Sequence, residues 1–121
     1  MKYLILLAHG SRDQTWSQAF ELMTTTLRER HANTLLAFME LSEPSFDDVV
    51  ATAVEKGASQ IDVLPLFLAK GRHLNHDIPQ MCKHNTELHA INVNLLPPIG
   101  EDPRLAQVVI DIAEQALDEA S

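Results

Sequence analysis

The chain has 121 residues, which fits one ordinary domain with its own hydrophobic core. Hydrophobic residues make up 45% of it and glycine and proline are few, which excludes a disordered chain. No apolar run approaches the ~20 residues of a membrane-spanning helix and no signal-peptide pattern is present, so we expect a complete, cytoplasmic protein with no membrane partner. The net charge of −8 argues against nucleic acid, because phosphate binding requires a concentrated positive surface.

Apolar runs and amphipathic stretches alternate four times along the chain. Residues 3–8 form a continuous apolar run, which is typical of a strand covered on both faces. Residues 14–30 carry apolar side chains at helical spacing, and residues 34–41 read as a second strand. Pro44 then suits the first turn of a helix and Gly57 its end.

The second half of the chain repeats this pattern. Residues 61–69 predict a third strand, residues 75–88 a helix, and residues 90–96 alternate as an edge strand does. Asp102 is a good N-cap with Pro103 at the first helical position. The apolar stripe of this last helix consists of Leu105, Val108, Val109, Ile112, Ala116 and Leu117.

Four strand–helix pairs with short connections predict an α/β fold with a parallel sheet and helices on both faces. We expect a three-layer, doubly wound, flavodoxin-like sheet in the order 2-1-3-4, forming a single domain over residues 1–121. Such sheets bind ligands outside the carboxyl ends of their strands, where the strand order reverses. The segments predicted to meet there are residues 9–13 and 68–77, and both contain histidine and arginine.

Two histidines and an acid could meet at this edge. His9 directly follows the first strand and His73 follows the third, and each imidazole can bind a metal or act as a base near neutral pH. Glu40 lies at the end of an apolar strand and could complete a mixed nitrogen and oxygen site for Co, Ni, Fe or Zn. Glu43, judged from the residues alone, is better explained as an acid at a helix start, where it favours the positive end of the helix dipole. The histidines lack the spacing of a helical zinc motif, so the pair alone does not define a metal.

Three cations lie on the same loops. Arg12, Lys70 and Arg72 would form a basic rim suited to carboxylates or phosphates, or be ordinary solvated charges. Gly10 and Gly71 permit close backbone approach but belong to no phosphate-binding fingerprint, so we do not expect a nucleotide site. The single cysteine, Cys82, cannot form an internal disulfide, which agrees with a reducing compartment, and we expect it in the core.

Four motifs, in this order, resemble those of the sirohydrochlorin chelatases, specifically the short cobaltochelatases of the CbiX type. They are "LLAHGSRD", "FMELSEPSFDDVV", "IDVLPLFLAKGRHLNHDIP" and "LPPIGEDPRL", and they span nearly the whole chain. The resemblance implies a lyase that inserts a divalent metal into sirohydrochlorin without ATP and without a permanently bound cofactor. Cobalt, for cobalamin biosynthesis, is the first expectation; iron for sirohaem and nickel for coenzyme F430 are the alternatives.

The resemblance also implies roles for individual residues. His9 corresponds to the metal ligand and proton acceptor, and His73 to a second metal-binding histidine. Glu40 is a candidate helper near the metal, and whether it or Glu43 assists proton removal stays open. The implied substrate-binding positions are Glu43, Leu68, Ala69, Lys70, Gly71, Arg72 and His73, with Arg12 added as part of the basic rim.

The length of the chain carries a further implication of the resemblance. Longer relatives hold two such domains with the active site between them, so a chain of this size supplies one half and is expected to form a homodimer around the macrocycle. Two other classes of function stay open: a carrier of metal or tetrapyrrole that uses the same cleft, and a regulatory flavodoxin-like domain.

Overall fold

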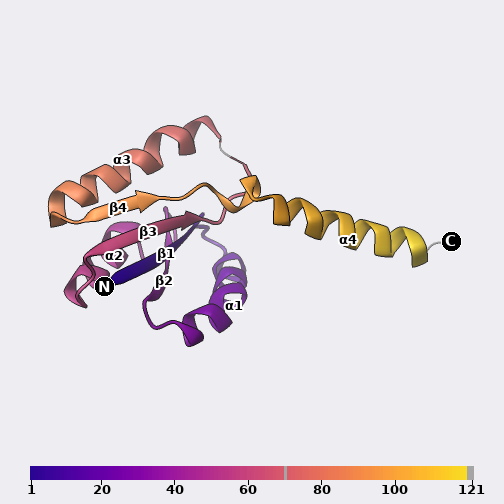
Figure 1. Ribbon diagram of the computed structural model, residues 1–121, viewed down its shortest axis with the longest axis horizontal. Coiled ribbons are helices and arrows are strands. Elements are labelled where there is room, and N and C mark those ends of the chain that lie inside the picture. Colours follow the sequence, from indigo (N-terminus) through magenta and orange to yellow (C-terminus); the bar gives the residue numbers. More distant parts are fainter. Residues whose placement is uncertain (70, 120–121) are drawn as a thin grey trace.

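The computed structural model describes residues 1–69 and 71–119, leaving out the side chains of residues 72–74. Strands and helices alternate along the chain (Figure 1). No helix within the described residues is long and apolar enough to span a lipid bilayer. The elements are β1 (Lys2–Ala8), α1 (Gln14–Arg30), β2 (Thr34–Phe38), α2 (Phe46–Glu55), β3 (Gln60–Pro65), α3 (Arg72–His89), β4 (Asn92–Leu95), the 3-10 helix η1 (Ile99–Glu101) and α4 (Pro103–Glu119).

The four strands form one parallel sheet in the order β2-β1-β3-β4. This confirms the predicted topology and places β1 and β3 at the centre, with the short β4 at an edge. Leu6 of β1 lies opposite Leu36 of β2 and Leu64 of β3. The carboxyl ends of β1 and β3 are therefore adjacent, as the doubly wound order requires.

Side chains alternate between two cores on opposite faces of this sheet. Ile5 and Leu7 of β1 face the larger core, where α2 and α3 contribute residues such as Phe46 and Ile78. Leu6 and Ala8 face the smaller core, which Phe20 of α1 helps to cover. The continuous apolar run of β1 thus serves both cores, as expected for a strand buried on both faces.

The boundaries around the second strand differ from the prediction. β2 ends at Phe38, not at residue 41, because the Phe38 amide donates to the carbonyl of Pro44 and Leu41 takes a φ of 64°. Ser45 caps α2 by accepting a hydrogen bond from the Asp48 amide at 3.2 Å. Pro44 therefore precedes the helix and is not in its first turn. Gly57, at φ 101°, follows the end of α2 as predicted.

The third strand is shorter than predicted and the third helix is longer. β3 ends at Pro65, a residue that cannot donate a ladder hydrogen bond. α3 begins at Arg72 and not at residue 75, with a first helical bond from the Asn75 amide to the Gly71 carbonyl at 3.1 Å. The apolar stripe missed this first turn because its first member, Ile78, comes later.

The last helix has the predicted start but not the predicted packing. Asp102 caps α4 through a 2.9 Å bond from the Arg104 amide to its Oδ1, and Pro103 is the first helical residue. α4 then leaves the body of the domain and points away from the sheet (Figure 1). The prediction of helices on both faces is confirmed for α1, α2 and α3, and is wrong for α4.

Candidate functional site

Four loops meet at the carboxyl edge of the sheet, at the topological switch point. One loop follows β1 directly, and backbone hydrogen bonds tie the loops after β2 and β3 to the end of β1. The Met39 amide donates to the Ala8 carbonyl at 2.9 Å, and the Leu66 amide donates to the Leu7 carbonyl at 2.8 Å. The fourth loop is tied in by Gly100, whose amide donates to the carbonyl of Phe67 at 2.9 Å. The site is thus built on a connected frame.

His9 is held by residues from two other parts of this frame. It follows β1 directly and is half-buried. Its imidazole packs against the ring of Phe67, with centroids 4.1 Å apart and planes at 41°. The indole Nε1 of Trp16, from the first turn of α1, donates to the His9 carbonyl at 2.9 Å. The position of the imidazole is therefore set by its own backbone and by a buried aromatic ring.

Phe67 and Trp16 are contacts of His9 that sequence reasoning missed. Trp16 reads as one member of the helical apolar stripe and Phe67 as one residue of an apolar run. Neither pattern shows that the two side chains converge on the same histidine. The one available signal is that "PLFLA", which contains Phe67, ends the strand next to β1 in the predicted order.

Gly10 allows the first loop to pack directly on the second. A Cβ at this position would lie 1.2 Å from the Glu40 carbonyl oxygen, so no other residue fits without a shift of the backbone. Ser42 then fixes the two loops together, because its Oγ accepts from the Ser11 amide at 2.9 Å and donates to the Ser11 carbonyl at 2.8 Å. The close approach that the sequence analysis allowed for Gly10 is observed.

The two candidate acids lie in different hollows. Glu43 and Arg12 line a hollow of about 410 Å³ together with Ser42. Glu40 lines another, of about 420 Å³, with Asp77 and His84 of α3. Among the described side chains, Glu43, and not Glu40, shares a hollow with Arg12 of the predicted basic rim. Within the part of the chain that the structure describes, no group of three or more His, Cys, Asp or Glu side chains is placed to hold a metal ion.

The loop that follows β3 carries the remaining candidates. Leu68 is 74% exposed, Ala69 is exposed, and Gly71 is the residue before α3. Lys70 lies outside the described residues, as do the side chains of Arg72 and His73, whose backbones form the first turn of α3. Leu41, at 60% exposure on the second loop, gives the carboxyl edge a second free apolar side chain. A large, partly apolar ligand would find both apolar surface and the His9 imidazole here.

The fold and this edge define a class: a doubly wound α/β protein with a histidine at the switch point of its sheet. The CbiX family model matches residues 3–116. The chain therefore belongs to the CbiX family.

Two relatives extend this comparison. The sirohydrochlorin cobaltochelatase of Sulfolobus acidocaldarius is 32% identical over 94% of this chain and 91% of its own length. The chloroplastic sirohydrochlorin ferrochelatase of Arabidopsis thaliana is also 32% identical, over 94% of this chain but only 52% of its own length.

Two solved structures share the fold. The CbiX protein of Marinobacter aquaeolei, described as a putative cobalamin biosynthesis protein, is 40% identical with a TM-score of 0.91 and covers 98% of this chain and 99% of its own. The sirohydrochlorin chelatase SirB of Bacillus subtilis, solved in complex with cobalt, is 25% identical with a TM-score of 0.82. It is matched over 94% of this chain and 50% of its own.

Proposed function

We propose that this protein is a sirohydrochlorin chelatase, a lyase that inserts Co²⁺ into sirohydrochlorin without ATP. One observation carries the proposal: in a CbiX-family chain, the position after the first strand is held by His9, whose ring is fixed at the switch point. Relatives of almost the same length bear the name sirohydrochlorin cobaltochelatase. The plant relative is named a ferrochelatase, so Fe²⁺ is the second candidate metal and Ni²⁺ the third.

Metal insertion replaces two pyrrole N–H protons of the macrocycle by one divalent ion. A neutral imidazole suits this exchange, because it can bind the incoming ion or accept a departing proton. We assign these tasks to His9, with His73 as the second metal-binding residue. The metal is a substrate in this scheme, and the protein keeps no permanent cofactor.

The carboxylates of the substrate would be held by the surrounding loops. Arg12, Lys70 and Arg72 supply the positive charge for them. Glu43 shares a hollow with Arg12, so we place it at the substrate's edge. Glu40 lines the hollow towards α3 and is the other candidate for assisting proton removal. The exposed side chain of Leu68 would lie against the macrocycle, and the neighbouring Ala69 and Gly71 would let the ring approach the backbone.

We further propose that the chain is one chelatase domain that works as a cytoplasmic homodimer. It matches about half the length of the plant relative and of SirB, so two copies would supply two domains. A cleft between the copies would then hold the macrocycle. The unpaired thiol of Cys82 is consistent with a reducing compartment.

The test is a spectroscopic insertion assay. The purified protein is incubated with sirohydrochlorin and limiting Co²⁺, Fe²⁺ or Ni²⁺ in separate samples, and the change in the absorption of the macrocycle is followed. We expect several turnovers per site with Co²⁺. Both H9A and H73A should lower the rate by at least about 100-fold, the range expected when an acid–base group is lost.

H31A is the matched control, because His31 is an exposed residue at the far end of α1. It should turn over as the wild type does. A wild-type rate no faster than the spontaneous reaction with all three metals would refute the proposal that the protein is a chelatase. Binding of one equivalent of metal or macrocycle without turnover would instead identify a carrier.

A further inference from the structure

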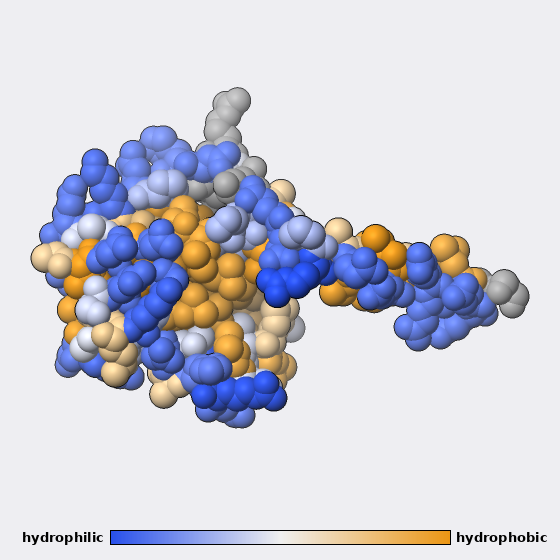
Figure 2. Space-filling view, in the orientation of Figure 1, coloured by the Kyte–Doolittle hydropathy of each residue, from blue (hydrophilic) through white to orange (hydrophobic). Residues whose placement is uncertain are grey.

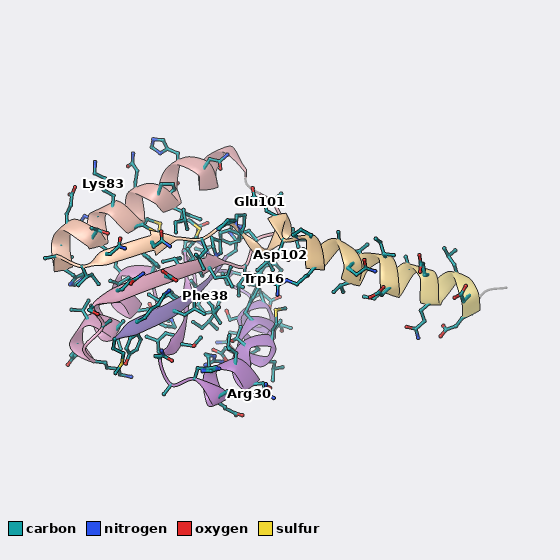
Figure 3. The ribbon with its side chains drawn as sticks, in the orientation of Figure 1. Trp16, Arg30, Phe38, Lys83, Glu101 and Asp102 are labelled. Carbon is teal, nitrogen blue, oxygen red and sulfur yellow. The ribbon has the colours of Figure 1, made fainter. Side chains whose placement is uncertain are left out.

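Trp16 lies beside the proposed metal ligand and reaches the surface. It belongs to the first turn of α1, and Figure 3 labels it at the carboxyl edge of the sheet, near the start of α4. Its place in the apolar stripe of α1 predicts a core residue, yet 45% of it is exposed. Leu41 and Leu68 are exposed at the same edge. Large apolar side chains from three segments thus reach solvent next to His9, and such a grouping marks a ligand surface.

Two contacts fix the indole in one orientation. Its Nε1 donates to the His9 carbonyl at 2.9 Å, and its ring meets that of Phe20 with centroids 5.3 Å apart and planes at 66°. Phe20 packs in turn against the smaller core. Because the single polar atom of the side chain is bonded within the protein, the part of Trp16 that solvent meets is mainly ring carbon.

A fixed aromatic surface suits a flat ligand. An aromatic ring that is already held in place loses little conformational entropy when a second ring stacks on it. The indole lies directly beside the histidine, since its Nε1 is bonded to the His9 carbonyl. A tetrapyrrole is much wider than this separation, so a macrocycle centred on the imidazole would also cover the indole.

The surroundings of the ring also match such a ligand. Ser17, the next residue of α1, lines the hollow of about 410 Å³ that Arg12 shares with Glu43. In Figure 2 apolar and strongly hydrophilic residues lie next to one another at this edge, beside the start of α4. A flat ligand with carboxylates on its periphery can place its plane on the indole and one carboxylate in the hollow. The net charge of −8 disfavours a nucleic-acid base as the flat ligand.

We infer that the indole ring of Trp16 is a stacking surface for the tetrapyrrole, and that its Nε1–H is a positioning contact for His9. The inference rests on the proposed function for the identity of the ligand and adds a residue that binds it. The two parts of the side chain have separable tasks. The ring contributes to the affinity for the macrocycle. The N–H group holds the backbone of the proposed proton acceptor and therefore contributes to the rate of insertion.

The first test compares two substitutions at this position. W16F keeps an aromatic ring but removes the donor, and W16L removes both. We expect W16L to raise the Kd for metal-free sirohydrochlorin about 10-fold, since a stacking contact is lost, and W16F to keep the wild-type Kd. Both variants should lower kcat for Co²⁺ insertion about 10-fold, because both release the His9 carbonyl. Absorption titration measures the Kd, and the insertion assay measures kcat.

L22A is the matched control, because Leu22 is an exposed apolar residue further along the same helix. It should keep the Kd and the kcat of the wild type. A wild-type Kd in W16L, or a loss of affinity as large in W16F as in W16L, would overturn the stacking surface. An unchanged kcat in W16F would overturn the positioning contact. Binding without turnover by the wild type would refute the chelatase alone, and a protein that binds no macrocycle would refute both.

The second test uses the wild type and so does not depend on how the variants fold. The chain has one tryptophan, so its indole N–H group gives a single signal in a nitrogen–proton NMR spectrum. Saturation with metal-free sirohydrochlorin should shift this signal strongly, because a proton beside a stacked macrocycle lies in its ring current. An unmoved signal at saturation would overturn the stacking surface. A shift produced by raising the protein concentration alone would show that a second copy covers the ring, and would overturn it as well.

Discussion

The ring of Phe67 supports the imidazole of His9, with their centroids 4.1 Å apart and their planes at 41°. Phe67 follows β3 and His9 follows β1, so the contact joins the two central strands of the sheet just beyond their carboxyl ends. Phe67 is 4% exposed and belongs to the larger core. The candidate metal ligand is thus positioned by a core residue.

Shortening Phe67 should therefore slow metal insertion. In F67L the imidazole loses its aromatic neighbour, and we expect kcat to fall about 10-fold as the ring leaves its productive position. The free energy of unfolding should fall by only about 1.5 kcal/mol, since leucine keeps most of the apolar volume. F46L removes a ring of the same core that makes no ring contact with His9 and should lose similar stability while keeping kcat. Equal kcat values for the two variants would contradict a positioning role for Phe67.

Gly10 and Gly71 provide a matched pair for the packing of the loops. G10A forces a methyl group against the Glu40 carbonyl and should lower the free energy of unfolding by about 2 kcal/mol or more. G71A has nothing within 4 Å of its new Cβ and should change stability by less than about 0.5 kcal/mol. Urea unfolding of both variants measures the difference. A stable G10A protein would show that the 9–13 and 39–45 loops are free to separate.

Cys82 should be unreactive in the folded protein. Burial raises the pKa of its thiol to about 11, so at pH 8 almost none of it is the nucleophilic thiolate. A thiol reagent such as iodoacetamide should label the native protein far more slowly than the denatured one, and mass spectrometry after timed quenching measures both rates. Fast labelling under native conditions would place Cys82 at an accessible surface.

The hydrogen bonds between Asp102 and Arg104 at the start of α4 should persist until the pH falls well below 4. The hydrogen bonds from Arg104 lower the pKa of the Asp102 carboxyl from 3.8 to about 2. A carboxyl whose pKa is lower in the folded protein stabilises it above the unfolded value, so this contribution declines as the pH falls from about 4 to about 2. NMR titration of the Asp102 carboxyl and the Arg104 amide should give a midpoint near pH 2 that rises in high salt, because the pair lies at the surface within reach of dissolved ions. A midpoint near 3.8 would show that the cap does not form.

Sequence patterns predict the elements whose signals are local. The bounds of α1 match the structure because its apolar spacing is regular and Asp13 caps it by accepting from the Thr15 amide. The predicted boundaries of the loop between β2 and α2 are wrong in detail. The course of this loop depends on hydrogen bonds between Ser42 and Ser11, 31 residues apart. No local pattern encodes such a contact.

The same limit applies to the site and to α4. Topology predicts that His9 lies at the switch point, since that follows from strand order alone. The ring that supports it, and the hollow that Glu43 shares with Arg12, depend on how the loops pack in three dimensions. The apolar stripe of α4 predicts that some surface covers the helix, but a stripe carries no information about which chain provides that surface.

Gly100 connects the start of α4 to the loop that follows β3. Its amide is bonded to the Phe67 carbonyl, and a Cβ at this position would lie 1.6 Å from the Leu68 carbonyl oxygen. The root of the projecting helix is therefore seated on the loop that supports His9 and carries the proposed substrate contacts. A ligand that shifts this loop also shifts the root of α4, and by thermodynamic reciprocity any partner that fixes α4 changes the affinity for that ligand by the same factor. Where that partner is the second copy of the proposed homodimer, affinity for the proposed macrocyclic substrate depends on protein concentration, so binding constants measured in dilute and in concentrated solution will differ.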